Sequence, residues 1–146
     1  MVTETRCMNL LLVEDDDDHA ALIRRGLRNS DLSLNITHVV DGVDAVDYLN
    51  GRDAYTEGAL PDLILLDLNL PRMNGHEVLT YIKSDPALRA IPVIVLTTSD
   101  APVDRQRAYA QFVNSYLVKP MDPTDFQALI HHLGEYWARI NTPCAS

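Results

Sequence analysis

Four short apolar runs in this chain each end in a polar or charged residue, and this pattern most constrains the fold. The runs with the residues that follow them are Leu10–Val13 with Glu14 and Asp15, Leu63–Leu66 with Asp67, Val93–Leu96 with Thr97, and Tyr116–Val118 with Lys119. Helix-like segments separate the runs, and this alternation predicts an α/β domain with a parallel sheet. The carboxyl ends of parallel strands lie along one edge of the sheet, where ligands bind. We therefore expect acidic groups, a hydroxyl and an amine to meet at one site.

The expected sheet has five strands with helices on both faces. The strands are predicted at Asn9–Val13, Leu34–His38, Leu63–Asp67, Val93–Thr97 and Ser115–Val118. Three of them are nearly continuous Leu, Ile and Val, which is typical of strands buried on both faces. Leu34–His38 alternates between polar and apolar residues, which favours an edge strand.

Five helices are expected between and after these strands. The first begins near Asp17 or Asp18, either a good N-cap, and buries Ala20, Ile23 and Leu27. The others are predicted at Val43–Leu49 with a cap at Gly51, His76–Lys83, Pro102–Phe112, and along the apolar stripe from Phe126 to Ile140. The segment Gly51–Leu60 is interpreted as a long surface loop, with a binding insertion as the alternative.

Length and composition indicate one folded domain. The chain has 146 residues, 47% of them hydrophobic, and a formal net charge of -9 from 12 basic and 21 acidic residues. No apolar run approaches the ~20 residues that cross a bilayer, so we expect no membrane association. No cluster of Lys and Arg is present, which argues against direct nucleic-acid binding. Two cysteines near the termini and the lack of a signal-peptide core favour the cytoplasm.

The acidic run from Glu14 to Asp18 predicts a metal site. Asp16, Asp17 and Asp18 are explained by a solvated turn and by favourable charge at a helix N-terminus. Glu14 and Asp15 directly follow a buried strand, so their carboxylates are expected to point into the crevice. Like charges there need a compensating cation. Mg²⁺ fits, because it takes one or two carboxylates and shares phosphate oxygens.

Asp67 is the candidate nucleophile. The turn-forming stretch that follows it, through Gly75, leaves the carboxylate at the sheet edge, and carboxylates attack phosphoryl groups. Lys119 and Mg²⁺ are expected to neutralise phosphoryl oxygens, while Thr97 donates a hydrogen bond.

Together, Glu14-Asp15, Asp67, Thr97, Tyr116 and Lys119-Pro120 resemble the receiver domain of two-component response regulators. The resemblance covers about residues 9–140 and leaves short tails at 1–8 and 141–146. It implies a flavodoxin-like (βα)5 fold with the strand order 2-1-3-4-5.

The resemblance also implies a role for each site residue. Asp67 would accept a phosphoryl group from the phosphohistidine of a sensor histidine kinase. Asp15, Asp67 and the main-chain carbonyl of Asn69 would bind Mg²⁺ directly, and Glu14 would act through water. The receiver would turn over no external substrate, catalysing only its own phosphorylation and slow dephosphorylation.

The activation step implied by the family involves three residues. Lys119 would pair with the phosphoryl group, Thr97 would shift towards that group, and Tyr116 would swing inward. A half-buried strand aromatic is the alternative interpretation of Tyr116. Two positions depart from the common pattern: Thr98 stands where Ala or Gly is usual, which puts the dephosphorylation rate in doubt, and Met121 stands where Phe is frequent.

Output is expected through protein–protein contact, phosphate relay or dimerisation, since no DNA-binding or catalytic output domain follows the fifth helix. The chain looks most similar to stand-alone receivers paired with bacterial phytochrome kinases, on the loop around Tyr55, the segment Val113–Tyr116 and the ending Glu135–Trp137. His132 and Tyr136 beside the core stripe suggest a homodimer through the face of the fourth helix, fifth strand and fifth helix.

Three other classes of protein share parts of this pattern. A haloacid-dehalogenase-type phosphatase needs a second Asp two residues after the nucleophile, where this chain has Asn69. A receiver-like interaction module that is never phosphorylated usually lacks one of the acidic groups or the lysine, all present here. A flavodoxin-like cofactor carrier would need a Gly-rich loop after the first strand, and none follows.

Overall fold

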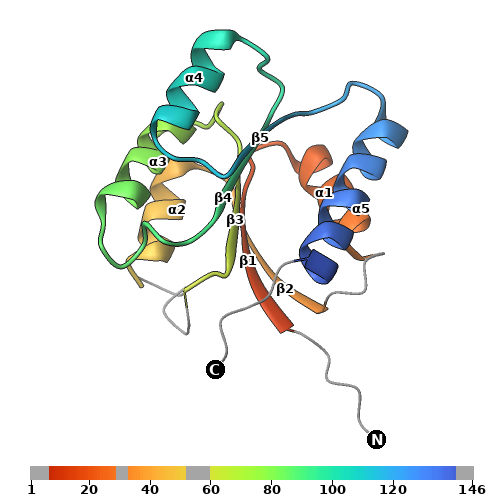
Figure 1. Cartoon of the computed structure of the whole chain (residues 1–146), viewed down its shortest axis with the longest axis horizontal. Helices are drawn as coiled ribbons and strands as arrows, with labels where there is room; N and C mark the ends of the chain where they lie inside the picture. The colour runs from red at the N-terminus through yellow and green to blue at the C-terminus, as the bar shows by residue number, and fades with distance from the viewer. Residues whose placement is uncertain (1–6, 29–32, 52–59, 141–146) are drawn as a thin grey trace, which may run out of the picture.

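The computed structural model describes residues 7–28, 33–51 and 60–140. Along the chain, strands and helices alternate five times (Figure 1). The elements are β1 Cys7–Val13, α1 Asp17–Arg28, β2 Ser33–Val39, α2 Gly42–Leu49, β3 Leu63–Leu66, α3 Gly75–Ser84, β4 Val93–Thr97, α4 Pro102–Ala110, β5 Ser115–Val118 and α5 Pro123–Ile140.

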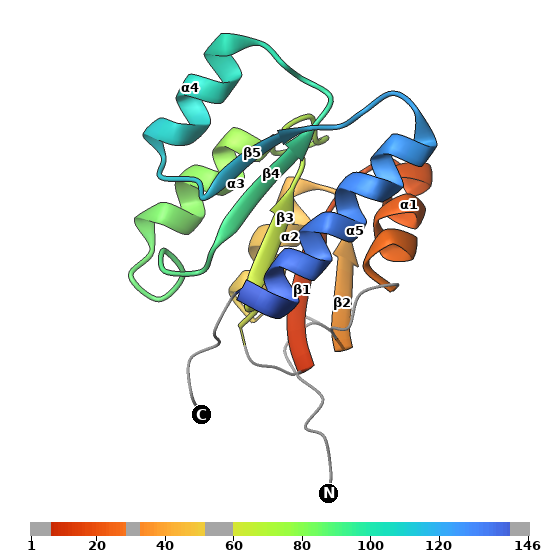
Figure 2. The same cartoon turned by 45° about the vertical axis from the view of Figure 1, so that its right-hand side comes forward.

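The five strands form one parallel sheet in the order β2-β1-β3-β4-β5, which confirms the predicted flavodoxin-like topology. Helices α1 and α5 cover one face and α2, α3 and α4 cover the other (Figures 1 and 2). The predicted edge position of β2 is correct. The carboxyl ends of β1, β3, β4 and β5 point the same way, so the residues that follow them share one edge.

The core lies on both faces because successive strand residues point to opposite sides. In β1, Leu11 and Val13 pack with α2, α3 and α4, while Leu10 and Leu12 pack with α1 and α5. The predicted buried residues of α1 are confirmed: Ala20, Ile23 and Leu27 are buried. On α5 the stripe is also confirmed where side chains are described, with Phe126 and Ile130 buried and Leu129, Leu133 and Trp137 packed against the same core.

Helix and strand ends differ from the prediction at several points. β3 stops at Leu66, so Asp67 is the first residue beyond the strand. The N-cap of α1 is Asp16, one residue earlier than expected, because its carboxylate accepts hydrogen bonds from the amides of Asp18 and His19. The C-cap of α2 is Asn50, and Gly51 follows it with φ 68°.

The end of α4 shows how a helix can stop without glycine. The helix ends at Ala110, two residues before the predicted Phe112. Phe112 takes the left-handed conformation with φ 63°, its amide donates to the carbonyl of Tyr109, and the amide of Val113 donates to that of Ala108. This is the Schellman pattern, in which the residue after the cap is usually Gly.

Residues 52–59, the main part of the segment interpreted as a long surface loop, lie outside the described residues. None of the described helices is long and apolar enough to cross a membrane.

The start of α3 fixes the loop that carries Asp67. Asn74 caps the helix in a reciprocal capping box with Glu77. A Cβ atom added to Gly75 would lie 2.3 Å from the carbonyl oxygen of Asp67 and 2.6 Å from Cα of Leu68. Only glycine therefore allows this approach of backbone to backbone.

We expect Gly75→Ala to lower the free energy of unfolding by more than about 2 kcal/mol, because backbone cannot move aside as a side chain can. Gly51→Ala is the control: its Cβ would meet no atom within 4 Å, and only the positive φ opposes it, at a cost of about 1 kcal/mol. Urea denaturation measures both. Equal losses in the two variants would contradict the close-packing argument.

Candidate metal and phosphoacceptor site

The side chain of Lys119 occupies the centre of the predicted site. Its Nζ lies 2.5 Å from Oε1 of Glu14, 2.9 Å from Oδ2 of Asp67 and 2.9 Å from Nδ1 of His19. Glu14, Asp67 and Lys119 are all buried. Strand ends β1, β3 and β5 thus bring together two carboxylates and one ammonium, as the sequence predicted.

Glu14 is the most deeply buried carboxylate of this group. Burial raises the pKa of Glu14 to about 7, despite the opposing effects of the hydrogen bond and charge of Lys119. The nearby charge of Asp67 raises it further. The acidic site therefore holds more negative charge than one lysine neutralises once Glu14 is ionised.

Three carboxylates at this point have the geometry of a cation site. Glu14, Asp15 and Asp67 each offer an oxygen, and these oxygens lie within 4.8 Å of one another. Asp15 is exposed, whereas the other two are buried, so the group opens to solvent on one side. An all-oxygen, anionic donor set of this kind suits a hard divalent cation such as Mg²⁺.

The backbone around Asp67 holds its carboxylate in place. The Asp67 amide donates to the carbonyl of Val13 at 3.1 Å, which continues the pairing of β3 with β1. The Asn69 amide donates to Oδ1 of Asp67 at 3.1 Å, so one carboxylate oxygen is held by the backbone and the other by Lys119. Asn69, predicted to offer its carbonyl, is therefore adjacent to the site.

Thr97 is fully buried at the end of β4, and its carbonyl accepts from the amide of Lys119 at 2.7 Å. The Ser99 amide donates to Oγ1 of Thr97 at 3.4 Å, and the Tyr116 hydroxyl donates to the Ser99 carbonyl at 2.8 Å. Tyr116 is half-buried and packs against the core. Burial raises the pKa of its phenol. Thr97 and Tyr116 are thus joined through the main chain of one residue.

Two further residues anchor the segment between β4 and α4. Oγ of Ser99 donates to Oδ2 of Asp104 at 2.6 Å, and Nε2 of His76 donates to Oδ1 of the same carboxylate at 3.0 Å. The hydrogen bonds from Ser99 and His76 lower the pKa of Asp104. The chain from His76 to Tyr116 connects α3, α4 and β5.

Sequence patterns did not identify His19, Asp104 or His76. The i+4 position of His19 after Asp15 was a usable signal, since it places His19 one helical turn beyond the acidic pair. Asp104 and His76 gave no signal, because their pairing joins residues of two different helices.

A cavity of about 540 Å³ opens beside Lys119. Its lining includes Thr98 and Met121, the two positions that depart from the common receiver pattern. Met121 is fully exposed.

Comparison with known proteins identifies the family. The profile of the response regulator receiver domain matches residues 10–131. The probable methanogenesis regulatory protein FilR2 of Methanothrix harundinacea is 45% identical over 90% of this chain and 84% of its own length. The chain belongs to the response regulator receiver family.

Two solved structures are similar along almost their whole length. The phosphorylated cyanobacterial phytochrome response regulator RcpA is 39% identical, with a TM-score of 0.88 over 92% of this chain and 96% of its own. The Mn²⁺-bound form of Rcp1 is 36% identical, with a TM-score of 0.90 over 94% and 99% of the two chains. In sequence, Rcp1 of Synechocystis is 38% identical over 91% of this chain and 90% of its own length.

We expect Mg²⁺ affinity to rise between pH 6 and pH 8. Below a pKa of about 7 Glu14 is neutral, and above it the site gains a third negative charge, so binding strengthens by roughly three- to tenfold. Titration calorimetry at each pH measures the affinity. In Glu14→Gln the pH dependence should largely vanish; an unchanged slope in this variant would assign it to another group.

Proposed function

We propose that this protein is a response regulator that takes a phosphoryl group on Asp67 from a sensor histidine kinase and so changes its affinity for partner proteins. The observation that carries the proposal is the Lys119 ammonium, 2.9 Å from the Asp67 carboxylate in a buried site. Catalysis of phosphoryl transfer consists mainly of positioning and charge neutralisation, and this geometry supplies both.

The proposed transfer is a single displacement at phosphorus. A carboxylate oxygen of Asp67 forms a bond to phosphorus as the bond from phosphorus to the kinase imidazole breaks. The electron pair of that bond stays on the imidazole nitrogen, which water can protonate. Lys119 redirects one N–H donor from the Asp67 carboxylate to an oxygen of the transferred phosphoryl group. The ammonium then stabilises the negative charge of that group.

The metal ligands are proposed to be Asp15, Asp67 and the main-chain carbonyl of Asn69, with Glu14 acting through water. The support is the grouping of the three carboxylate oxygens and the position of Asn69 beside Asp67. When bound, Mg²⁺ supplies positive charge to phosphoryl oxygens. Glu14 is engaged with Lys119, which suits an indirect role for this carboxylate.

The switch is proposed to run from Thr97 through Ser99 to Tyr116. Thr97 would donate its hydroxyl to the phosphoryl group, and the segment after β4 would follow it. A contact made in only one of two arrangements biases their equilibrium by its differential energy. Phosphorylation would thereby favour the arrangement in which Tyr116 packs inward and bonds to the Ser99 carbonyl.

The proposed kinase is a bacterial phytochrome in the cytoplasm. The support is the likeness to RcpA, described as a phytochrome response regulator, across nearly the whole of both chains.

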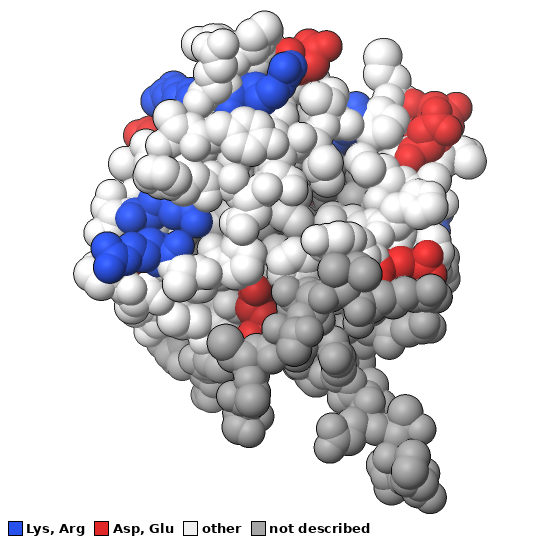
Figure 3. All heavy atoms as spheres, viewed as in Figure 1, with Lys and Arg blue, Asp and Glu red and all other residues white. Residues whose placement is uncertain are grey.

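The proposed output surface is the face formed by α4, β5 and α5, with a second copy of this chain as one partner. Among the described residues, most exposed large hydrophobic side chains lie on these elements or between them: Val103, Tyr109, Phe112, Val118, Met121 and Tyr136. In the view of Figure 1, uncharged side chains cover much of the surface between α4 and α5 (Figure 3). An apolar face of this kind can meet itself across a two-fold axis.

We expect a gain of one phosphoryl group in the intact mass after incubation with acetyl phosphate and Mg²⁺. EDTA and Asp67→Asn should both abolish the gain, because one removes the metal and the other the nucleophile. Asp17→Asn is the matched control: it removes an exposed carboxylate from the same acidic run and should retain the gain.

Two outcomes would argue for the other classes. Absence of a mass gain with acetyl phosphate and with a phosphorylated histidine kinase would favour an interaction module that is never phosphorylated. Repeated turnover of an aryl phosphate would favour a phosphatase.

We expect Phe112→Asn to weaken self-association without loss of folding stability. The Phe112 side chain is 78% exposed, and Asn tolerates the left-handed backbone at φ 63° better than Phe. Sedimentation of the phosphorylated protein measures the dimer, and Val40→Asn, exposed but outside this face, is the control. Equal dimerisation in all three proteins would exclude this face as the interface.

A further inference from the structure

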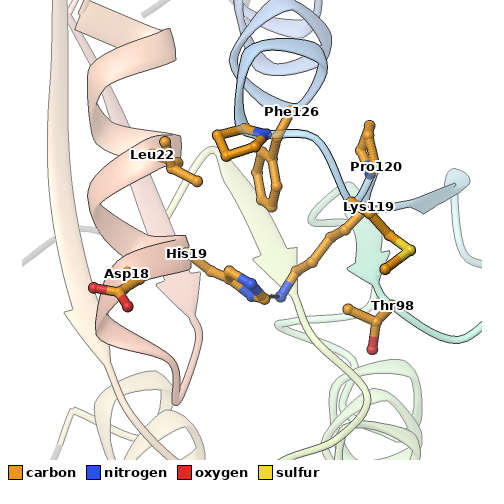
Figure 4. Close-up of a pocket in the computed structure, with 9 residues that line it drawn as sticks. Asp18, His19, Leu22, Thr98, Lys119, Pro120 and Phe126 are labelled. Carbon is orange, nitrogen blue, oxygen red and sulfur yellow. Dashed lines mark hydrogen bonds between the residues drawn. The ribbon is translucent and has the colours of Figure 1, made fainter.

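His19 has no role in the reaction described so far, yet it contacts the central cation of the site. It lies in the first part of α1, and its Nδ1 is 2.9 Å from Nζ of Lys119. Its ring packs against Phe126 of α5, with 5.5 Å between centroids and 46° between planes. Figure 4 shows His19 and Lys119 pointing toward each other across the cavity, with Phe126 beside them.

The three contacts of Lys119 account for all of its hydrogen-bonding capacity. An ammonium has three N–H donors and no acceptor. Two of the three acceptors around Nζ, Glu14 and Asp67, are carboxylates that belong to the reacting site, and the third is His19. His19 is therefore the one acceptor of the ammonium that does not belong to the reacting carboxylates.

The direction of this hydrogen bond defines the state of the imidazole. Lys119 donates, so Nδ1 must carry a lone pair and the ring proton must lie on Nε2. Nε2 in turn faces Oδ2 of Asp16 at 3.8 Å, which favours that tautomer electrostatically. The only other charged group lining this cavity among the described residues is Asp18, and α5 contributes Pro123 and Phe126.

We propose that His19 is a positioning residue for phosphoryl transfer, which holds the Lys119 ammonium in line with the Asp67 carboxylate through a hydrogen bond to its uncharged imidazole. The inference rests on the proposed phosphorylation of Asp67. When Lys119 turns one donor to the incoming phosphoryl group, Glu14 and His19 keep the other two and prevent the long side chain from moving.

A neutral acceptor suits this position better than a third carboxylate. Glu14 and Asp67 already place negative charge beside Lys119, and another anion would repel the phosphoryl group and offset the lysine charge. The imidazole occupies the third donor without adding charge. Misplacement of a reacting group by about 1 Å can slow a reaction 100-fold, so one extra contact is sufficient to matter.

The test compares residues of similar size with and without an acceptor. His19→Gln can still accept from Lys119, whereas His19→Leu has no acceptor and His19→Met offers only a weakly accepting thioether sulfur. We expect the two apolar variants to lower the rate of phosphorylation by acetyl phosphate about 10- to 100-fold, and Gln to stay within about threefold of the native rate. Mg²⁺ affinity should change little in all of them, because His19 contacts no proposed ligand of the metal.

A role in packing alone predicts the opposite order. Leu and Met would preserve the apolar contact with Phe126 better than Gln, so rates for these two at or above the Gln rate would overturn the proposal.

A second readout does not depend on phosphorylation. The ¹⁵N signal of the Lys119 ammonium should be protected from exchange with water in the native protein and in His19→Gln, and lost in His19→Leu. If the native protein accepts no phosphoryl group, the proposed function is wrong. The ¹⁵N signal still shows whether His19 holds the Lys119 ammonium. Equal protection in all variants would overturn the positioning role.

Discussion

The structure of the site depends on one buried ammonium that is shared between carboxylates from distant parts of the chain. Lys119 lies 105 residues from Glu14 and 52 residues from Asp67 along the sequence. The sheet order places β1 beside β3, but β4 separates β3 from β5. The lysine side chain must therefore reach across the end of β4, where the Lys119 amide donates to the carbonyl of Thr97 at 2.7 Å. Removal of the lysine would leave two carboxylates buried without a compensating charge, whereas removal of one carboxylate leaves the lysine paired with the other.

Much of the fold could be predicted because strand positions depend on local hydrophobic patterns. The apolar runs before Glu14, Asp67 and Thr97 are buried strands, and their order along the chain sets which polar residues meet. The ends of elements were less predictable. Asp16 caps α1 although Asp17 and Asp18 are equally good cap residues, and Phe112 ends α4 in a conformation for which sequence rules expect glycine. Tertiary packing decides such cases.

The supporting contacts of the site could not be predicted for a related reason. The contact of His19 with Lys119 requires the position of α1 relative to the end of β5, and the pairing of His76 with Asp104 requires the spacing of α3 and α4. No single segment carries that information. The acidic cluster, by contrast, follows from strand polarity alone. The residues that perform the chemistry are thus easier to predict from the sequence than those that hold them in position.

The connection from Thr97 through Ser99 to Tyr116 depends on the backbone of Ser99 more than on its side chain. Ser99 contacts Thr97 through its amide and Tyr116 through its carbonyl, whereas its contacts with Asp104 and with the amide of Ala101 use its side chain. Any residue with a free amide preserves the first two contacts, whereas proline removes the donor. Evolution can therefore vary this side chain, and with it the anchoring of the start of α4, without breaking the connection that passes through the backbone.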